Sequence, residues 1–66
     1  MNLHIEFEQE NDGRWIAEIP ELPGVLVYGI TKEDAKSKVE ALAFRVLADQ
    51  LEREGTSTDH VAFAVA

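Results

Sequence analysis

The stretch NDGRWIAEIPELPG, residues 11–24, decides how this chain folds. Its Asp12-Gly13 dipeptide is typical of the turn in a β-hairpin, so a strand should lie on each side of it. Pro20 ends the second strand because proline has no N–H to donate to a ladder. The Glu-Leu-Pro-Gly run that follows, residues 21–24, is typical of a tight corner. The stretch therefore predicts two strands and a sharp change of direction.

Three further segments have strand patterns. Residues 3–8 alternate between apolar and polar side chains, as half-buried strands do. Residues 25–30 are apolar on almost every position, which predicts a central strand or one covered on both faces. Residues 61–65 alternate between larger apolar residues and alanine. This last strand could pair on both sides within the sheet, or it could be an edge that continues the sheet into a second copy.

One long helix is predicted between the third and the last strand. Thr31 is a good N-cap, and the acidic residues 33 and 34 lie where the helix dipole favours them. The helix should run to about Glu54, with Gly55 as the C-terminal cap. Apolar residues recur at helical spacing and should face the sheet; they are Ala35, Val39, Leu42, Ala43 and Val46.

The predicted fold is therefore α+β, with the order β-β-β-α-β. A four-stranded mixed sheet carries the helix on one face, and residues 1–66 form a single domain. The opposite face stays without a helix and should be partly acidic and partly apolar. The residues expected on it are His4, Glu6, Glu8, Arg14, Ile16, Glu18, Ala62 and Ala64, together with Val25 and Val27.

Size and composition favour self-association. A 66-residue chain buries only about 60% of its unfolded surface, so its core is small. There is no cysteine to supply a disulfide or a thiolate metal site. Domains of this kind often complete their burial by oligomerising, and we expect a homodimer or a higher homo-oligomer.

The charge balance limits the possible partners. The chain has 13 acidic and 6 basic residues and a net charge of −7. Such a protein repels phosphate backbones, so we expect no direct nucleic-acid binding. The acidity suits a basic protein partner, although it could serve solubility alone. No apolar run reaches the ~20 residues of a membrane helix, and no signal peptide is recognisable, so we expect a cytoplasmic protein.

The acidic residues of the predicted strands are candidate metal ligands. Glu6, Glu8 and Glu18 could share one face, but two-metal chemistry needs carboxylates that converge on ions about 4 Å apart. A solvated acidic face is the commoner use of such residues. His4 and His60 have no spacing typical of zinc ligands. We expect no catalytic residue, no metal site and no cofactor.

The helix has an apolar arc wider than one sheet contact needs. At 100° per residue, Phe44 lies opposite Ala35, and Leu47 and Leu51 lie between them. With Phe63 of the last strand, these residues form a candidate self-association surface. The alternative is one exposed phenylalanine covered by neighbouring side chains, because scattered apolar residues are normal on surfaces.

The chain resembles the HicB family, the antitoxins of HicA–HicB toxin–antitoxin pairs. The resemblance runs from about Ile5 to Val65, and many family members continue into a DNA-binding module that these 66 residues do not contain. The residues that carry it are Asp12-Gly13-x-Trp15-x-Ala17, then Pro20-Glu21-Leu22-Pro23-Gly24, then Gly29-x-Thr31-x-Glu33-x-Ala35.

The resemblance implies a partial ribonuclease-H-like fold without catalysis. It also implies a partner, a small basic HicA-type ribonuclease that cuts messenger RNA and is neutralised by surface occlusion. The residues expected to contact this toxin are Glu6, Glu8, Ile16, Glu18 and Glu21. Two alternatives stay open: a stand-alone interaction module without a toxin, and a residual metal-dependent nuclease.

Overall fold

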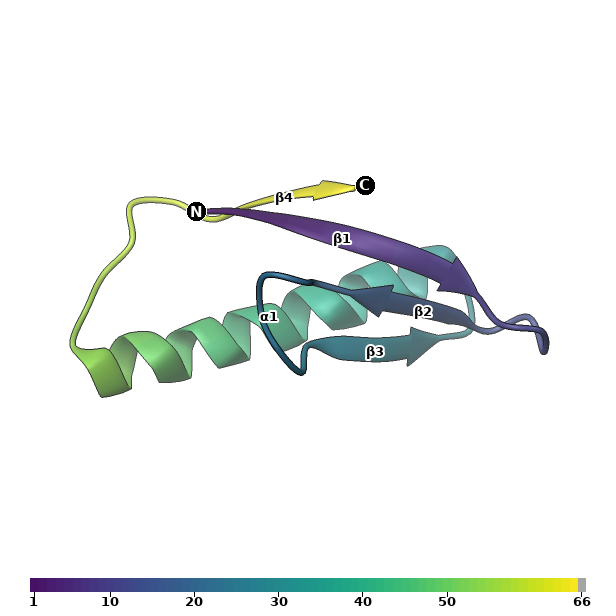
Figure 1. Ribbon diagram of the computed structural model, residues 1–66, viewed down its shortest axis with the longest axis horizontal. Helices are drawn as coiled ribbons and strands as arrows, with labels where there is room; N and C mark the ends of the chain where they lie inside the picture. The colour runs from purple at the N-terminus through teal and green to yellow at the C-terminus, as the bar shows by residue number, and fades with distance from the viewer. Residues whose placement is uncertain (66) are drawn as a thin grey trace.

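The computed structural model describes residues 1–65, and the predicted order β-β-β-α-β is confirmed (Figure 1). Four strands form one sheet and one helix lies on one of its faces. The elements are β1 (Asn2–Gln9), β2 (Trp15–Glu18), β3 (Leu26–Gly29), α1 (Lys32–Glu54) and β4 (Ala62–Val65).

The sheet is mixed, with the strand order β3-β2-β1-β4. β1 pairs antiparallel with β2, and β2 pairs antiparallel with β3. β4 returns after the helix to pair parallel with β1. The prediction that residues 25–30 form a central strand, or one covered on both faces, is wrong, because β3 is an edge strand and its Leu26 and Tyr28 are exposed. Within residues 1–65, β4 pairs with β1 alone and forms the other edge.

Side-chain and backbone hydrogen bonds fix the predicted turn and corner. A carboxylate oxygen of Asp12 accepts the backbone N–H of Arg14 at 3.0 Å, which closes the hairpin turn. At the corner, the N–H of Ile19 donates to the carbonyl of Val25 at 3.1 Å, and the N–H of Val25 donates to Leu22 at 3.1 Å. Ile19 and Val25 are thereby held together as a closing pair, and both side chains are buried.

The helix begins and ends where its sequence predicts. The Thr31 hydroxyl accepts the N–H of Asp34 at 2.9 Å, as an N-cap does. At the other end Gly55 has φ +66 and donates its N–H to the carbonyl of Leu51. Glycine adopts this left-handed conformation without a side-chain clash, so it is the usual residue at this position.

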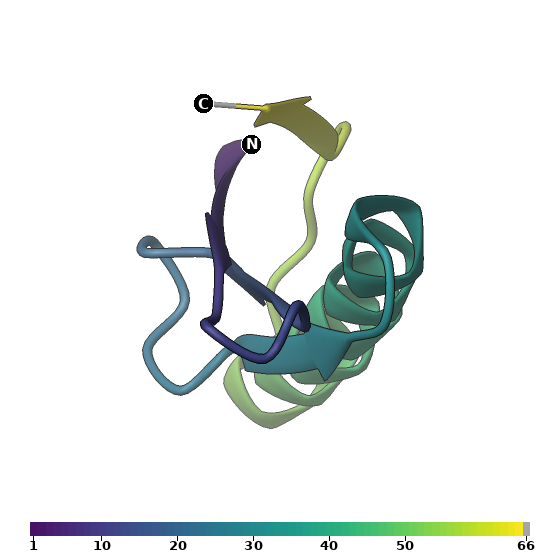
Figure 2. The same cartoon turned by 90° about the vertical axis from the view of Figure 1, so that its right-hand side faces the viewer.

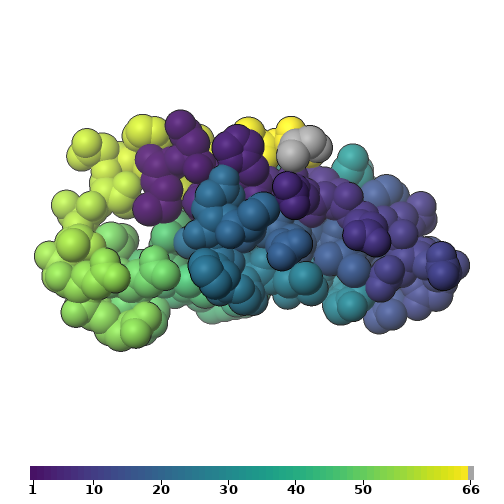
Figure 3. Space-filling view, in the orientation of Figure 1, coloured from purple at the N-terminus to yellow at the C-terminus, as the bar shows by residue number. Residues whose placement is uncertain are grey.

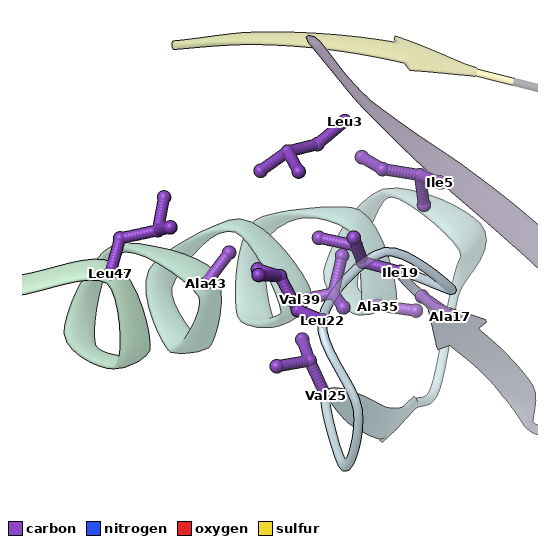
Figure 4. Close-up of a cluster of buried hydrophobic side chains, with 10 residues drawn as sticks. All are labelled: Leu3, Ile5, Ala17, Ile19, Leu22, Val25, Ala35, Val39, Ala43 and Leu47. Carbon is purple, nitrogen blue, oxygen red and sulfur yellow. The ribbon is translucent and has the colours of Figure 1, made fainter. Parts of the chain in front are cut away.

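The core lies between the sheet and α1 (Figure 4), and among residues 1–65 no polar or charged residue is buried. Gly29 of β3 lets the helix approach unusually closely. A Cβ atom added there would lie 2.4 Å from the backbone nitrogen of Ala35. The buried residues are Leu3, Ile5, Ala17, Ile19, Leu22, Val25, Ala35, Val39, Ala43 and Leu47.

The helix does not cover the whole sheet. α1 packs mainly on β2 and β3, and the sheet curls so that β1 and β4 lie farther from the helix axis (Figure 2). The molecule is elongated, with extents of 42 × 19 × 16 Å and a radius of gyration of 12.5 Å. A compact domain of this length has a radius of about 11 Å. Within residues 1–65, no helix combines the length and the apolar character needed to cross a membrane.

Candidate functional site

The sheet face that points away from α1, called the open face below, faces the viewer in Figures 1 and 3. The strand register decides what it carries. Glu6 of β1 lies opposite Glu18 of β2, and Glu8 lies opposite Ile16. Directly opposite residues in an antiparallel pair project to the same side, so the structure brings these four predicted residues together on the open face.

The carboxylates on the open face are not neutralised within the chain. Glu6 and Glu18 are both exposed and occupy directly opposite positions. Within residues 1–65, neither of them, nor Glu8, takes part in an ion pair. Like charges directly opposite each other destabilise a sheet, by an amount of order 0.2–1 kcal/mol. The open face therefore carries negative charge at some cost to the isolated fold.

Apolar side chains from β3 lie beside these acids. Tyr28 lies opposite Ile16, and Leu26 lies opposite Glu18. Tyr28 is 45% exposed and Leu26 is 42% exposed, and the guanidinium of Arg14 lies 4.7 Å from the centre of the Tyr28 ring. The open face thus combines uncompensated acids with exposed apolar surface.

The prediction that Val25 and Val27 lie on the open face is wrong. Val25 is buried, and Val27 is half-buried against the core. The geometry of the corner at residues 19–25 indicates which side chains of β3 point into the core. If the corner is tight enough to pair Ile19 with Val25, both side chains must point into the core and the alternate positions of β3 must point outward.

Glu21 lies at one end of the open face. The backbone pairing of β2 with β1 ends before Pro20, and beyond that point the Glu21 side chain bonds to β1 instead. One of its oxygens accepts the backbone N–H of His4 at 3.1 Å, and the other lies 2.5 Å from the His4 ring nitrogen Nδ1. These hydrogen bonds, the one from the His4 side chain first, hold the pKa of the Glu21 carboxyl below its ordinary value. In Figure 3 the corner accordingly lies against the start of the chain. Glu21 is thus placed beside the other predicted contact residues with its orientation fixed.

The predicted self-association residues do not form one surface. Leu47 is buried at one end of the core (Figure 4), so its assignment to an exposed surface is wrong. It belongs to the same buried cluster as Val39 and Ala43 of the sheet-facing stripe. Leu51 is half-buried. Phe44 is 53% exposed, and its ring packs edge-on against Phe63 of β4 with 5.5 Å between the ring centres.

The two histidines lie apart from one another in separate contacts. His4 is held by Glu21, whereas His60 meets the amino terminus, which donates to the His60 carbonyl at 2.9 Å. Across residues 1–65, no three histidine or acidic side chains converge in an arrangement that could hold a metal ion.

A shallow hollow of about 210 Å³ lies on the helix side, near the start of α1. Phe7, Val65 and the stems of two lysines line it, together with Glu33. The ammonium of Lys32 lies 4.9 Å from the centre of the Phe7 ring, a distance at which a cation is attracted to the ring face. The Lys32 ammonium therefore occupies the face of the Phe7 ring within this hollow.

Comparison of the chain with protein-family models, curated proteins and solved structures gives no match.

Proposed function

We propose that this protein is a HicB-like antitoxin, which binds a small basic HicA-type ribonuclease on its open face and neutralises it by occlusion. The observation that carries the proposal is the uncompensated pair Glu6–Glu18, together with Glu8. A cross-strand pair of like charges lowers the stability of the free protein, and a basic partner would remove that cost. Stability is commonly reduced at residues that serve a function.

The physical basis of neutralisation is complementarity rather than chemistry. The negative charge of the open face steers a basic partner toward it and raises the association rate. Burial of Ile16, Leu26 and Tyr28 then slows dissociation, because the apolar centre of an interface holds the complex together. In this proposal the antitoxin performs no reaction and covers the RNA-binding side of the toxin.

The same proposal includes a partial ribonuclease-H-like fold and action in the cytoplasm. The strand order β3-β2-β1-β4 with a single crossing helix supports the first of these. The net charge of −7 supports a protein partner over direct contact with RNA.

The test is co-expression with the product of the adjacent reading frame, which should be short and basic and should contain a histidine. We expect the two proteins to purify together and the protein to inhibit messenger RNA cleavage by the partner. If the basic product of the adjacent reading frame does not bind, the proposal is contradicted.

A charge reversal tests the face itself. Glu18→Lys turns the repulsive pair with Glu6 into an attractive one, so we expect the free protein to become more stable by about 0.2–1 kcal/mol. The same change should weaken toxin binding at least tenfold, because it places a positive charge opposite a basic partner. The matched control is Glu52→Lys on α1, which makes the same change in net charge away from the open face.

These two variants give a clear decision. Glu18→Lys that binds as tightly as the parent, or Glu52→Lys that weakens binding equally, would show that net charge rather than the open face governs binding.

A further inference from the structure

A second apolar surface lies at the β4 edge of the sheet and is separate from the open face. It consists of Phe44 on α1 and of Phe63 and Val65 on β4, and we call it the edge strip. Phe44 is 53% exposed and Val65 is 52% exposed, while Phe63 is half-buried against Phe44. Among residues 1–65, the edge strand β4 pairs with β1 and with no other strand.

Half of the β4 backbone groups point away from the sheet. Ala62 donates its N–H to the carbonyl of Met1 at 2.9 Å, which places the Ala62 backbone on the β1 side. Backbone groups alternate in direction along a strand, so Ala64 also faces β1, whereas Phe63 and Val65 direct theirs to the outer edge. An edge with free donors and acceptors, no proline and no charge is a template for another strand.

From this geometry we infer that two copies of this chain join through β4, which pairs antiparallel with β4 of the second copy across a two-fold axis. The result is one continuous eight-stranded sheet. The inference rests on the edge strip and does not depend on the proposed antitoxin function.

Symmetry restricts the register to a small choice. Opposite residues in an antiparallel pair share a face, so Phe63 must lie opposite either Phe63 or Val65 of the second copy. Both registers gather the two edge strips on the helix side of the joined sheets. Because Phe44 packs against Phe63 in each copy, its ring lies at this seam and is covered there.

The distribution of charge favours a second copy of the chain over a basic partner at the edge strip. Each copy carries a net charge of −7, so two copies approach best where neither presents a charged side chain. Residues 61–65 contain none, and the acids of β1 and β2 lie on the open face. A basic partner is attracted to those acids instead. The two surfaces therefore suit different partners.

β3 is the other edge and is a less suitable site for pairing. α1 packs against β3 more closely than against any other strand, and Gly29 at the end of β3 has no side chain to pack against a second copy.

The test measures the mass in solution by sedimentation equilibrium up to about 100 µM, because self-association depends on concentration. The parent should reach the dimer mass, twice 7.4 kDa. Val65→Pro should stay monomeric, because proline removes an outward N–H and leaves the bonds of Ala62 and Ala64 to β1 intact. Val65→Thr keeps that N–H and should still form the dimer.

A second pair of variants tests the side chains under the seam. Phe44→Glu should be monomeric with an unchanged circular dichroism spectrum, because its side chain is mostly exposed. Ile30→Glu introduces the same charge at a residue that is 78% exposed next to the β3 edge, and it should still form the dimer. Amide exchange of Phe63 and Val65 should slow as the parent concentration rises.

Three results would overturn the inference. The first is a parent that remains at 7.4 kDa throughout. The second is a dimer that survives both Val65→Pro and Phe44→Glu. The third is a dimer lost in Ile30→Glu and kept in Phe44→Glu, which would assign the contact to the β3 edge.

Discussion

Replacing Gly29 with alanine should destabilise the protein more than any other single-methyl addition to a glycine of this chain. The added Cβ would lie 2.4 Å from the backbone nitrogen of Ala35 and 2.7 Å from its Cα. Ordinary contacts of a Cβ atom are 3.4–4 Å, so β3 and the first turn of α1 must separate by about 1 Å at this point. The added Cβ has no rotatable bond of its own and the two nearest atoms belong to the Ala35 backbone, so no side-chain rotation can relieve the clash.

The expected loss follows from the cost of overpacking. Extra methylene groups in a packed core cost about 1–3 kcal/mol and occasionally more, and we expect about 3 kcal/mol here because the helix itself must move. A 66-residue domain is stable by roughly 3–10 kcal/mol in total. The change should lower the melting temperature by about 12–24 °C, at about 4–8 °C per kcal/mol for a domain of this size.

The assay is urea unfolding followed by circular dichroism, with Gly55→Ala as the control. Gly55 has open space around it. The free energy of unfolding of that variant should therefore fall by about 1 kcal/mol, which is the cost of the left-handed conformation to alanine. The double variant Gly29→Ala with Ala35→Gly should recover little, because the two closest atoms belong to the backbone. Full recovery in the double variant, or a loss below that of Gly55→Ala, would refute the close-approach argument.

Three further changes test the caps, the corner and the corrected core. Thr31→Ala removes the acceptor of the Asp34 N–H and should cost about 1 kcal/mol in urea unfolding; an unchanged midpoint would contradict the capping role. The pKa of Glu21 is lowered by its hydrogen bonds with His4. The contribution of these hydrogen bonds to the free energy of unfolding is therefore complete above the ordinary carboxyl pKa of 4.5 and is lost as the pH falls through the lower pKa of the folded state. Glu21→Gln should flatten the stability profile in that acid range, and a profile parallel to that of the parent would count against the pair. Leu47→Ala should cost about 2–4 kcal/mol because the side chain is buried, whereas a surface leucine would cost under 0.5 kcal/mol.

Much of the fold could be predicted because local signals agree with the final structure. The caps Thr31 and Gly55 define the helix to the residue. The Asp12-Gly13 turn and the Pro20 corner likewise separate the strands correctly. Each signal depends on hydrogen bonds within a few residues, and such bonds form in the same way whatever lies farther along the chain.

The errors all concern which surface another element covers. β3 is apolar on both faces, which hides the fact that one face stays open, and only its pairing with β2 shows that Tyr28 points outward. Leu47 lies at the margin of the helix stripe, and its burial in the core cluster depends on tertiary packing that helical spacing does not define. The shared face of Glu6, Glu8, Ile16 and Glu18 was predicted correctly because alternation along β1 and β2 determines which side chains share a face once the hairpin is known.

The pairing of β4 with β1 has a consequence for synthesis on the ribosome. Of the described elements, β1 is made first and β4 last, and Asn2 lies opposite Ala62. While the intervening sixty or so residues emerge, the flank of β1 that will receive β4 has bare amide and carbonyl groups, as an incomplete sheet does. The parallel pairing of β1 with β4 can therefore form only after β4 has left the ribosome, and until then this flank of β1 has the properties of an open sheet edge.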